Sequence, residues 1–109
     1  MYLIIDKQKL LIKNANTFIK KLKGLLGIKN LTYGMFFWHT NSIHTIGMKT
    51  NIDVIAINNN NIVIAKYENV PKNKIIIIHN SIKNTNILEL PPFKSKNINI
   101  NDQLSFINK

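Results

Sequence analysis

The chain has 109 residues, a length typical of a single domain with one hydrophobic core. It contains no cysteine, which excludes disulfide bonds, thiolate zinc sites and cysteine nucleophiles. All 15 of its basic residues are lysine, and its formal net charge is +10 at pH 7. Because arginine is the side chain best suited to paired contacts with phosphate and guanine, we interpret this charge as a solubility feature and do not expect a nucleic-acid partner.

The N-terminal segment and the hydropathy of the chain predict a soluble protein without a membrane partner. No basic leader precedes the first apolar run, and Asp6 and Lys7 end that run too early for a signal peptide. No stretch approaches the roughly 18 apolar residues that a membrane-spanning helix needs. We therefore expect a cytoplasmic location.

The N-terminal part of the chain predicts a hairpin followed by a helix. Two apolar runs, residues 3–5 and 10–12, flank a polar turn. Asn14 or Asn16 can then cap a helix, whose apolar positions recur at helical spacing and predict a lid over one opening of a β structure. These apolar positions are Phe18, Leu22, Leu25 and Leu26, and the helix is expected to end near the last of them.

From Tyr33 onward, short apolar runs alternate with turn residues, a pattern typical of strands. The asparagines at 58–61 predict a hairpin, because asparagine tolerates positive φ. Four consecutive isoleucines at 75–78 predict a strand covered on both faces. The strands are expected at residues 34–38, 52–57, 62–67, 74–79, 87–90 and 103–107. About seven short strands and one helix predict a mostly β (α+β) single domain over residues 1–109, either barrel-like or a strongly curved sheet.

The segment at residues 42–58 concentrates the polar residues that could form a site. A carboxylate gains nothing from a strand interior, so Asp53 within an apolar run either ties down backbone donors or faces a site. Gly47 predicts a bulge or a positive φ just before this strand. The candidate ligand-binding residues are His44, Thr45, Met48, Lys49 and Asp53.

Three interpretations of this segment remain open. The first is a small binding or accessory domain whose polar cleft takes a small polar or anionic ligand or a peptide end, with Lys49 supplying positive charge. The second is a hydrolase in which His44 is the general base and Asp53 orients it, which requires the two side chains within about 3 Å, or one water, of each other. The third is a structural domain whose motif only builds a difficult turn.

Other chemistries find less support in the sequence. The three histidines, His39, His44 and His79, lack the spacing of a metal site, and the four glycines form no phosphate-binding loop. We therefore expect no metal and no cofactor. The five acidic residues are not paired along the chain, although Glu89 could lie near Asp53 across a sheet.

Several short motifs match a known family in order and spacing. They are Gly-Leu-Leu-Gly at 24–27, Gly-Met-Phe-Phe at 34–37, Ser-Ile-His-Thr-Ile-Gly-Met-Lys at 42–49, Ile-Asp-Val-Ile at 52–55 and Leu-Glu-Leu-Pro at 88–91. Over about residues 15 to 106 the chain resembles the small bacterial and archaeal family known as domain of unknown function 192. The resemblance implies a compact, mostly β, barrel-like domain with a short helix. No biochemical activity is established for that family, so the resemblance predicts the fold more than the function.

The chain departs from the family's pattern at four places. Lys21 stands in a helix position usually filled by arginine, and Ile46 stands where an aromatic residue is common. Asn101 replaces the glycine of a Gly-Asp turn, and asparagine is the least costly replacement at positive φ. Pro-Pro-Phe at 91–93 replaces Pro-Ala-Gly, so we expect that turn to be built differently.

Overall fold

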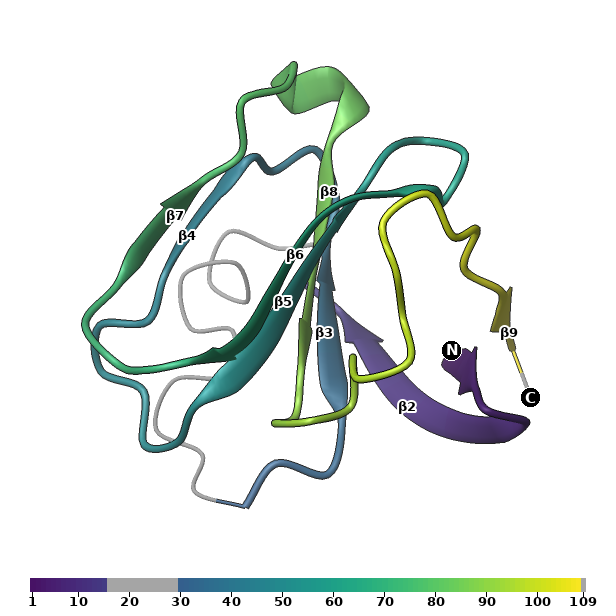
Figure 1. Cartoon of the computed structure of the whole chain (residues 1–109), viewed down its shortest axis with the longest axis horizontal. Coiled ribbons are helices and arrows are strands. Elements are labelled where there is room, and N and C mark those ends of the chain that lie inside the picture. The colour runs from purple at the N-terminus through teal and green to yellow at the C-terminus, as the bar shows by residue number, and fades with distance from the viewer. Residues whose placement is uncertain (16–29, 109) are drawn as a thin grey trace.

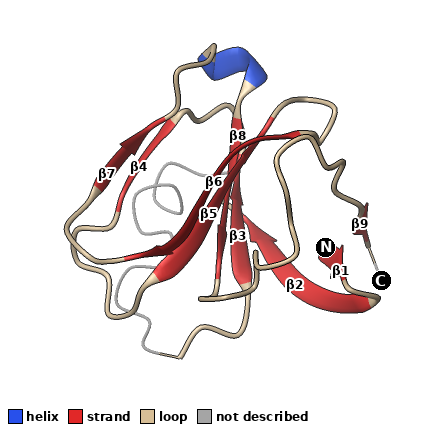
Figure 2. Cartoon of the chain, in the orientation of Figure 1, coloured by secondary structure: helices blue, strands red, loops and turns tan. Residues whose placement is uncertain are grey.

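The computed structural model of the chain describes residues 1–15 and 30–108. These residues fold almost entirely into strands and connecting loops, with one turn of 3₁₀ helix, η1 (Figures 1 and 2). The strands are β1 (Tyr2–Ile5), β2 (Gln8–Asn14), β3 (Gly34–Phe37), β4 (Ser42–His44), β5 (Ile52–Ile57), β6 (Val63–Val70), β7 (Ile75–Ile77), β8 (Asn86–Leu90) and β9 (Phe106–Ile107); η1 is Ile82–Asn84.

Seven strands form one sheet in the order β6-β5-β8-β3-β2-β1-β9, and β4 pairs with β7 in a separate two-stranded sheet. The large sheet is not closed into a barrel, because β6 and β9 are its edges. The C-terminal segment reaches the start of β6 only locally, where Val63 exchanges backbone hydrogen bonds with Asn101 and Asp102. The radius of gyration is 12.5 Å, close to the roughly 13 Å of a compact domain of about 100 residues. The expected compact, mostly β fold is therefore confirmed, whereas closure into a barrel is not.

Strand β5 runs through the middle of the core, and both of its faces are covered. Successive side chains point to opposite faces of a strand, so Val54 and Ala56 pack on one side of the sheet while Ile55 and Ile57 pack on the other. All six residues of β5 are buried, which explains its almost continuously apolar sequence. We call the two sides cluster A, which includes Met35, Met48, Val54, Ile76 and Ile78, and cluster B, which includes Phe36, Ile55, Leu88 and Ile98.

Residues with positive φ make the tight turns between strands. Asp6 and Lys7, with φ of 51° and 65°, form a two-residue connection between β1 and β2, as a type I′ turn requires. Asn61, with φ of 61°, lies in the predicted hairpin between β5 and β6. Asn101 has φ of 77°, which confirms that asparagine stands at a positive-φ position there.

The isoleucine run at 75–78 and the predicted helix differ in outcome from the other elements. The isoleucine run forms β7, but Ile75 and Ile77 are 70% and 56% exposed, so the expectation of a strand covered on both faces is wrong. Strand β7 belongs to the two-stranded sheet, and its inner face alone, through Ile76, reaches cluster A. The predicted amphipathic helix and the Gly-Leu-Leu-Gly motif lie outside the described residues.

Gly34 marks a close approach of three strands. β3 lies between β2 and β8, and a Cβ added at Gly34 would meet the Glu89 carbonyl oxygen at 2.7 Å and the Ile12 side chain at 2.8 Å. Glycine is the residue that leaves room for this packing.

Candidate functional site

The motif segment leaves the two-stranded sheet at His44 and turns sharply before it enters β5. Gly47 has φ of 87°, and the N–H of Met48 donates to the carbonyl of Thr45 at 3.1 Å. This is the arrangement of a type II turn with glycine at its third position. The predicted positive φ of Gly47 is confirmed.

Thr45 fastens this turn to the loop that joins β6 and β7. Its side chain is fully buried, and its Oγ1 donates to the Pro71 carbonyl at 2.7 Å and accepts from the Lys74 N–H at 2.8 Å. The Thr45 N–H also donates to the Lys74 carbonyl at 2.8 Å. The hydroxyl therefore satisfies backbone groups of another loop.

Asp53 is fully buried and lies opposite a β-bulge in β6. The β5–β6 register shifts by one residue between Ile52 and Val54, so β6 carries one extra residue at this point. Asn69 in the bulge has φ of 51°, and its N–H donates to Asp53 Oδ1 at 2.8 Å. The carboxylate therefore satisfies the donor that the bulge removes from the ladder.

The second carboxylate oxygen of Asp53 holds the loop after β8. Its Oδ2 accepts hydrogen bonds from the N–H of Ser95 at 3.0 Å and from the Ser95 hydroxyl. Ser95 is itself fully buried. Hydrogen bonds to an ionised acceptor are the stronger kind, so one carboxylate joins β5, the β6 bulge and this loop. Of the two roles that the sequence leaves open for Asp53, tying down backbone donors is the one that these contacts support.

Among the residues that the structure describes, the five candidate residues do not share one face of the fold. Ile43 packs against cluster A, so its neighbour His44 points outward from β4 and is exposed. Lys49 is also exposed, whereas Met48 is buried in cluster A. Asp53 alternates with residues of cluster A and lies on the cluster B side of the sheet.

This placement bears directly on the hydrolase interpretation. Within residues 1–15 and 30–108, no hydrogen bond or ion pair joins His44 to Asp53, whose oxygens accept from Asn69 and Ser95. Glu89 does not supply a second carboxylate, because Leu90 is the residue that pairs with Asp53, and Glu89 therefore faces the opposite side. The same described residues contain no group of three or more side chains that could hold a metal ion.

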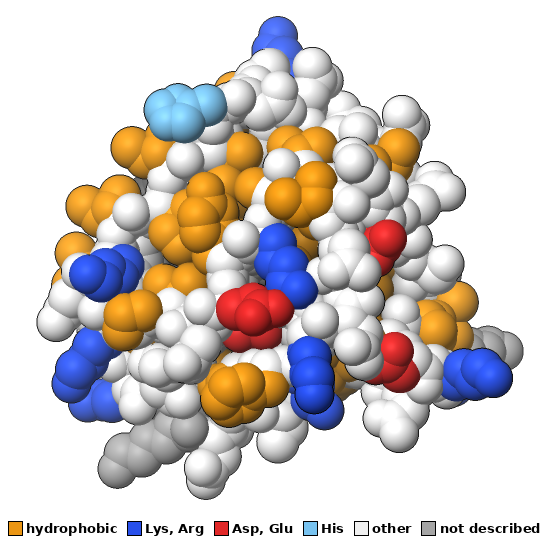
Figure 3. All heavy atoms as spheres, in the orientation of Figure 1, with side chains coloured by type: hydrophobic (Ala, Val, Ile, Leu, Met, Phe, Trp, Pro, Cys, Tyr) orange, Lys and Arg blue, Asp and Glu red, His pale blue; other side chains and the backbone are white. Residues whose placement is uncertain are grey.

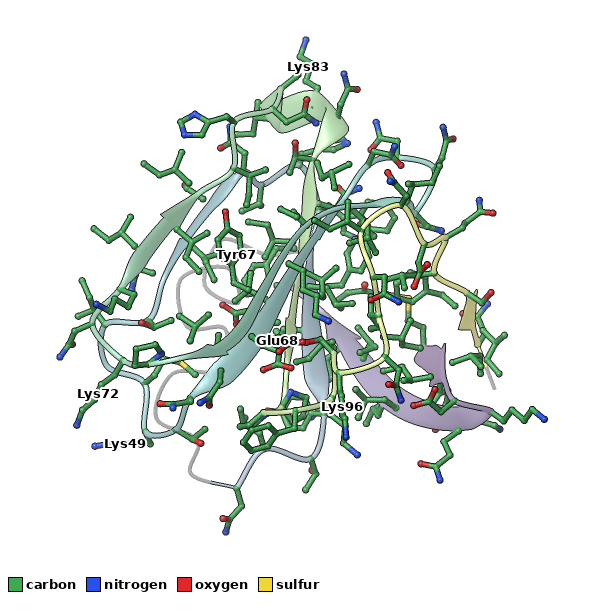
Figure 4. The ribbon with its side chains drawn as sticks, viewed as in Figure 1. Lys49, Tyr67, Glu68, Lys72, Lys83 and Lys96 are labelled. Carbon is green, nitrogen blue, oxygen red and sulfur yellow. The ribbon has the colours of Figure 1, made fainter. Side chains whose placement is uncertain are left out.

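A surface pocket of ≈ 320 Å³ opens beside the Asp53 bulge. Strands β5 and β6 supply one wall, and the loop after β8 supplies the other. Glu68 and Lys96 lie near one another at the centre of the face seen in Figure 4, and Figure 3 shows acidic, basic and apolar groups side by side there. The lining residues are Asp53, Glu68, Asn69, Phe93 and Lys96.

Phe93 is the unusual member of this pocket. The N–H of Lys94 donates to the Pro91 carbonyl at 3.3 Å, and Phe93 has φ of 70°, as expected for the third position of a type II turn. Glycine is the ordinary residue at that position, yet the Phe93 side chain is present and 72% exposed. Phe93 therefore adopts a conformation that glycine would adopt without strain.

Sequence reasoning found one lining residue of this pocket, Asp53, and missed Glu68, Asn69, Phe93 and Lys96. A signal for Phe93 was present, because Pro-Pro-Phe stands where the family pattern has Pro-Ala-Gly. A large residue in place of a turn glycine indicates a positive φ and a side chain forced outward. Glu68 and Asn69 carried no such signal, since nothing in their local sequence indicates a bulge.

Comparisons with known proteins agree with this fold. A protein of unknown function from Novosphingobium aromaticivorans DSM 12444 superposes with a TM-score of 0.78 at 14% identity, over 96% of this chain and 82% of the other. A protein from Sinorhizobium meliloti 1021, provisionally described as a transcription regulator, superposes with a TM-score of 0.76 at 18% identity, over 95% and 89% of the two chains. At such identities the likeness establishes the fold alone. No curated protein matches this chain significantly.

In the parts of the chain that the structure describes, no helix is long and apolar enough to cross a membrane. The sequence matches the model of the DUF192 family, described as "Uncharacterized ACR", over residues 2–106, which is nearly its full length. This chain therefore belongs to the DUF192 family.

Proposed function

We propose that this chain is a binding domain and that the pocket beside the Asp53 bulge takes a small ligand with both an ammonium and an anionic group, such as an amino acid. The observation that carries the proposal is Phe93. A side chain in the left-handed region costs roughly 1–2 kcal/mol, and a ring that is 72% exposed recovers little of this by burial. A strained residue at a pocket is a reason to look for function there, and an exposed ring offers a flat contact surface.

The charges around the pocket favour a ligand of this kind. Glu68 is an exposed carboxylate that forms an ion pair with Lys66, whose Nζ lies 2.7 Å from Glu68 Oε1. An ammonium group would meet Glu68 and the face of Phe93, which attract a cation through charge and through the ring quadrupole. Lys96 would meet the anionic group from the other wall. The volume of ≈ 320 Å³ lies at the small end of ordinary ligand pockets, which run from about 300 Å³ upward.

The motif residues take different roles under this proposal. Asp53 shapes the pocket by holding Asn69 and Ser95 in place. Thr45 and Met48 fix the turn at Gly47 and act through the fold. His44 and Lys49 are exposed elsewhere and do not line the pocket, so we assign them no contact with this ligand.

Titration of ¹⁵N-labelled protein with each of the common amino acids tests the proposal by NMR. We expect at least one of them to shift the amide signals of Asn69 and Ser95, with a Kd of about 1 mM or below, equivalent to roughly −4 kcal/mol. Phe93→Leu keeps the strained backbone but removes the ring, and it should weaken binding severalfold, whereas Phe93→Tyr should retain it.

Two charge variants distinguish binding in the pocket from binding to acidic groups elsewhere on the surface. Glu68→Gln should weaken binding of the amine, while Asp102→Asn, an exposed acid outside the pocket, should leave it unchanged. If no amino acid shifts these amides, or if Phe93→Leu binds as well as the unaltered protein, the proposal is wrong.

A further inference from the structure

Strands β6 and β7 follow one another in the chain, but they are not paired with each other. β6 is an edge of the large sheet, and β7 pairs only with β4. From the loop that joins them the two strands diverge, and we call the space between them the opening (Figure 1). A second pocket, of ≈ 360 Å³, lies in this opening between Ile64, Ala65 and Tyr67 of β6 and residues 77–80.

The outer edge of β7 presents backbone groups that the fold does not use. The Lys74 carbonyl accepts from the N–H of Thr45, and the N–H of Ile78 donates to the Asn41 carbonyl, so residues 74, 76 and 78 direct their backbone groups toward β4. In an antiparallel ladder the alternate residues, Ile75 and Ile77, direct theirs outward. Among the described residues no hydrogen bond from outside the β4 ladder reaches either of them.

The residues that line the opening are mostly apolar, and they also include the polar residues His79 and Asn80. Ile75, Ile77 and Tyr67 are 70%, 56% and 39% exposed, and Ile64 is partly buried beside them. Figure 3 shows apolar groups gathered on this face, to the left of the central acidic group. Folded proteins ordinarily cover, charge or shorten such an edge, because an open apolar edge pairs with other chains. β7 is short, with three residues, but none of the three is charged, and Ile75 and Ile77 are exposed.

We infer that the opening between β6 and β7 takes an extended, acidic peptide segment of another protein, which adds a strand to the outer edge of β7. Strand addition supplies partners for the backbone of Ile75 and Ile77, and alternate apolar side chains of the peptide cover Tyr67 and Ile64. This surface is distinct from the small-ligand pocket, with which it shares no lining residue.

Charge identifies the chemistry of the peptide. Lys72 and Lys74 belong to the loop that joins the two strands and closes one end of the opening. Figure 4 shows Lys72 there, at the lower left, and Lys83 in η1 at the top of the molecule. Glu68 is the one acidic residue in β6 and β7. A second copy of this chain would bring its own net charge of +10 to this basic surface, which disfavours self-association.

Selection from a displayed library of random peptides about ten residues long, the upper length of ordinary strands, tests the inference. The bait is the full chain, and a second bait carries Ile77→Pro. Proline at Ile77 removes an outward N–H and leaves the hydrogen bonds to β4 in place. We expect enriched peptides that are net negative and alternate apolar with polar residues, and that lose affinity about tenfold or more for Ile77→Pro.

A matched variant controls for exposed apolar surface. Ile100 is 55% exposed, almost the same as Ile77, but it lies outside the opening. Ile77→Glu should abolish binding of the selected peptides, whereas Ile100→Glu should leave it unchanged. Thermal unfolding of each variant checks that the fold is retained.

Hydrogen exchange reads out the added strand directly. Without peptide, the outward N–H groups of Ile75 and Ile77 should exchange quickly while that of Ile76 is protected. With a selected peptide bound, all three should be protected. The inference is overturned if the unaltered chain enriches no peptides that the Ile77→Pro bait fails to bind. It is also overturned if the enriched peptides are not acidic, or if a bound peptide leaves the N–H groups of Ile75 and Ile77 unprotected. It is also overturned if protection at these two residues rises with protein concentration alone, because the occupant is then a second copy of the chain.

Discussion

Two turns in this molecule have the same backbone arrangement, but the residue with positive φ is glycine in one and phenylalanine in the other. In the turn at residues 45–48, Gly47 has φ of 87°, and in the turn at residues 91–94, Phe93 has φ of 70°. Each is closed by a hydrogen bond from the N–H of its fourth residue to the carbonyl of its first. Each is also tied to a buried polar side chain, Thr45 in the first turn and Asp53, through Ser95, beside the second.

The two turns differ in whether backbone preference explains the residue with positive φ. The first uses the residue that its conformation prefers, and its polar contacts join it to the loop between β6 and β7. The second places a large ring in the same conformation, beside a pocket, where neither backbone preference nor burial explains it. Removing either anchor should destabilise its own turn, whereas exchanging the residues with positive φ should affect the two turns in opposite directions.

The largest effect is expected from Asp53→Asn. The amide group of asparagine would direct its own N–H donors at Asn69 or Ser95, so buried donors that now have an acceptor would lose it. We expect the free energy of unfolding in urea to fall by about 3 kcal/mol. Glu68→Gln, at an exposed acid that among the described residues takes part only in a surface ion pair with Lys66, should change it by less than about 1 kcal/mol. An equally small change for Asp53→Asn would show that its three contacts do not hold the second turn.

Thr45→Val tests the anchor of the first turn. Valine has nearly the same shape but leaves the Pro71 carbonyl and the Lys74 N–H without their partner. We expect a loss of about 2 kcal/mol in the free energy of unfolding. Thr45→Ser keeps the hydroxyl and should lose distinctly less, so a larger loss for serine than for valine would assign the effect to the methyl group instead.

Much of the fold follows from the sequence because its signals are local. Alternation and continuous apolar runs locate β5 and β8, and the asparagines at 58–61 mark a hairpin through their tolerance of positive φ. The exposure of Ile75 and Ile77 could not be predicted in the same way. Four consecutive isoleucines indicate a strand, but how many sheets cover that strand depends on pairings distant in the chain.

The candidate site was predictable only in part for a related reason. The oddity of Asp53 in an apolar strand is visible in the sequence, but its partners Asn69 and Ser95 are 16 and 42 residues away. The bulge that creates the need for a carboxylate is a shift in register between two strands, which no local pattern encodes. Polar residues that lie close together in sequence, such as His44 and Asp53, are separated by the alternation of strand faces.

Gly47→Ala tests whether the first turn needs glycine for its positive φ. Alanine at φ of 87° carries the steric cost of the left-handed region, and we expect a loss of about 1–2 kcal/mol in the free energy of unfolding. Gly47→Asn should lose less than alanine, because asparagine enters this region more readily. Equal losses for both variants would mean that φ is not the property that glycine supplies here.

The smallest effect, and the one of opposite sign, is expected at Phe93. Phe93→Gly and Phe93→Ala remove the same exposed ring, but only alanine retains a Cβ at φ of 70°. Relief of the left-handed strain favours glycine by about 1–2 kcal/mol, and the greater freedom of glycine in the unfolded chain takes back about 0.5–1 kcal/mol. Chemical denaturation should therefore find Phe93→Gly more stable than Phe93→Ala by roughly 0.5–1 kcal/mol. If alanine proves as stable as glycine, the second turn is not strained, and the reason for assigning Phe93 a role in binding disappears with it.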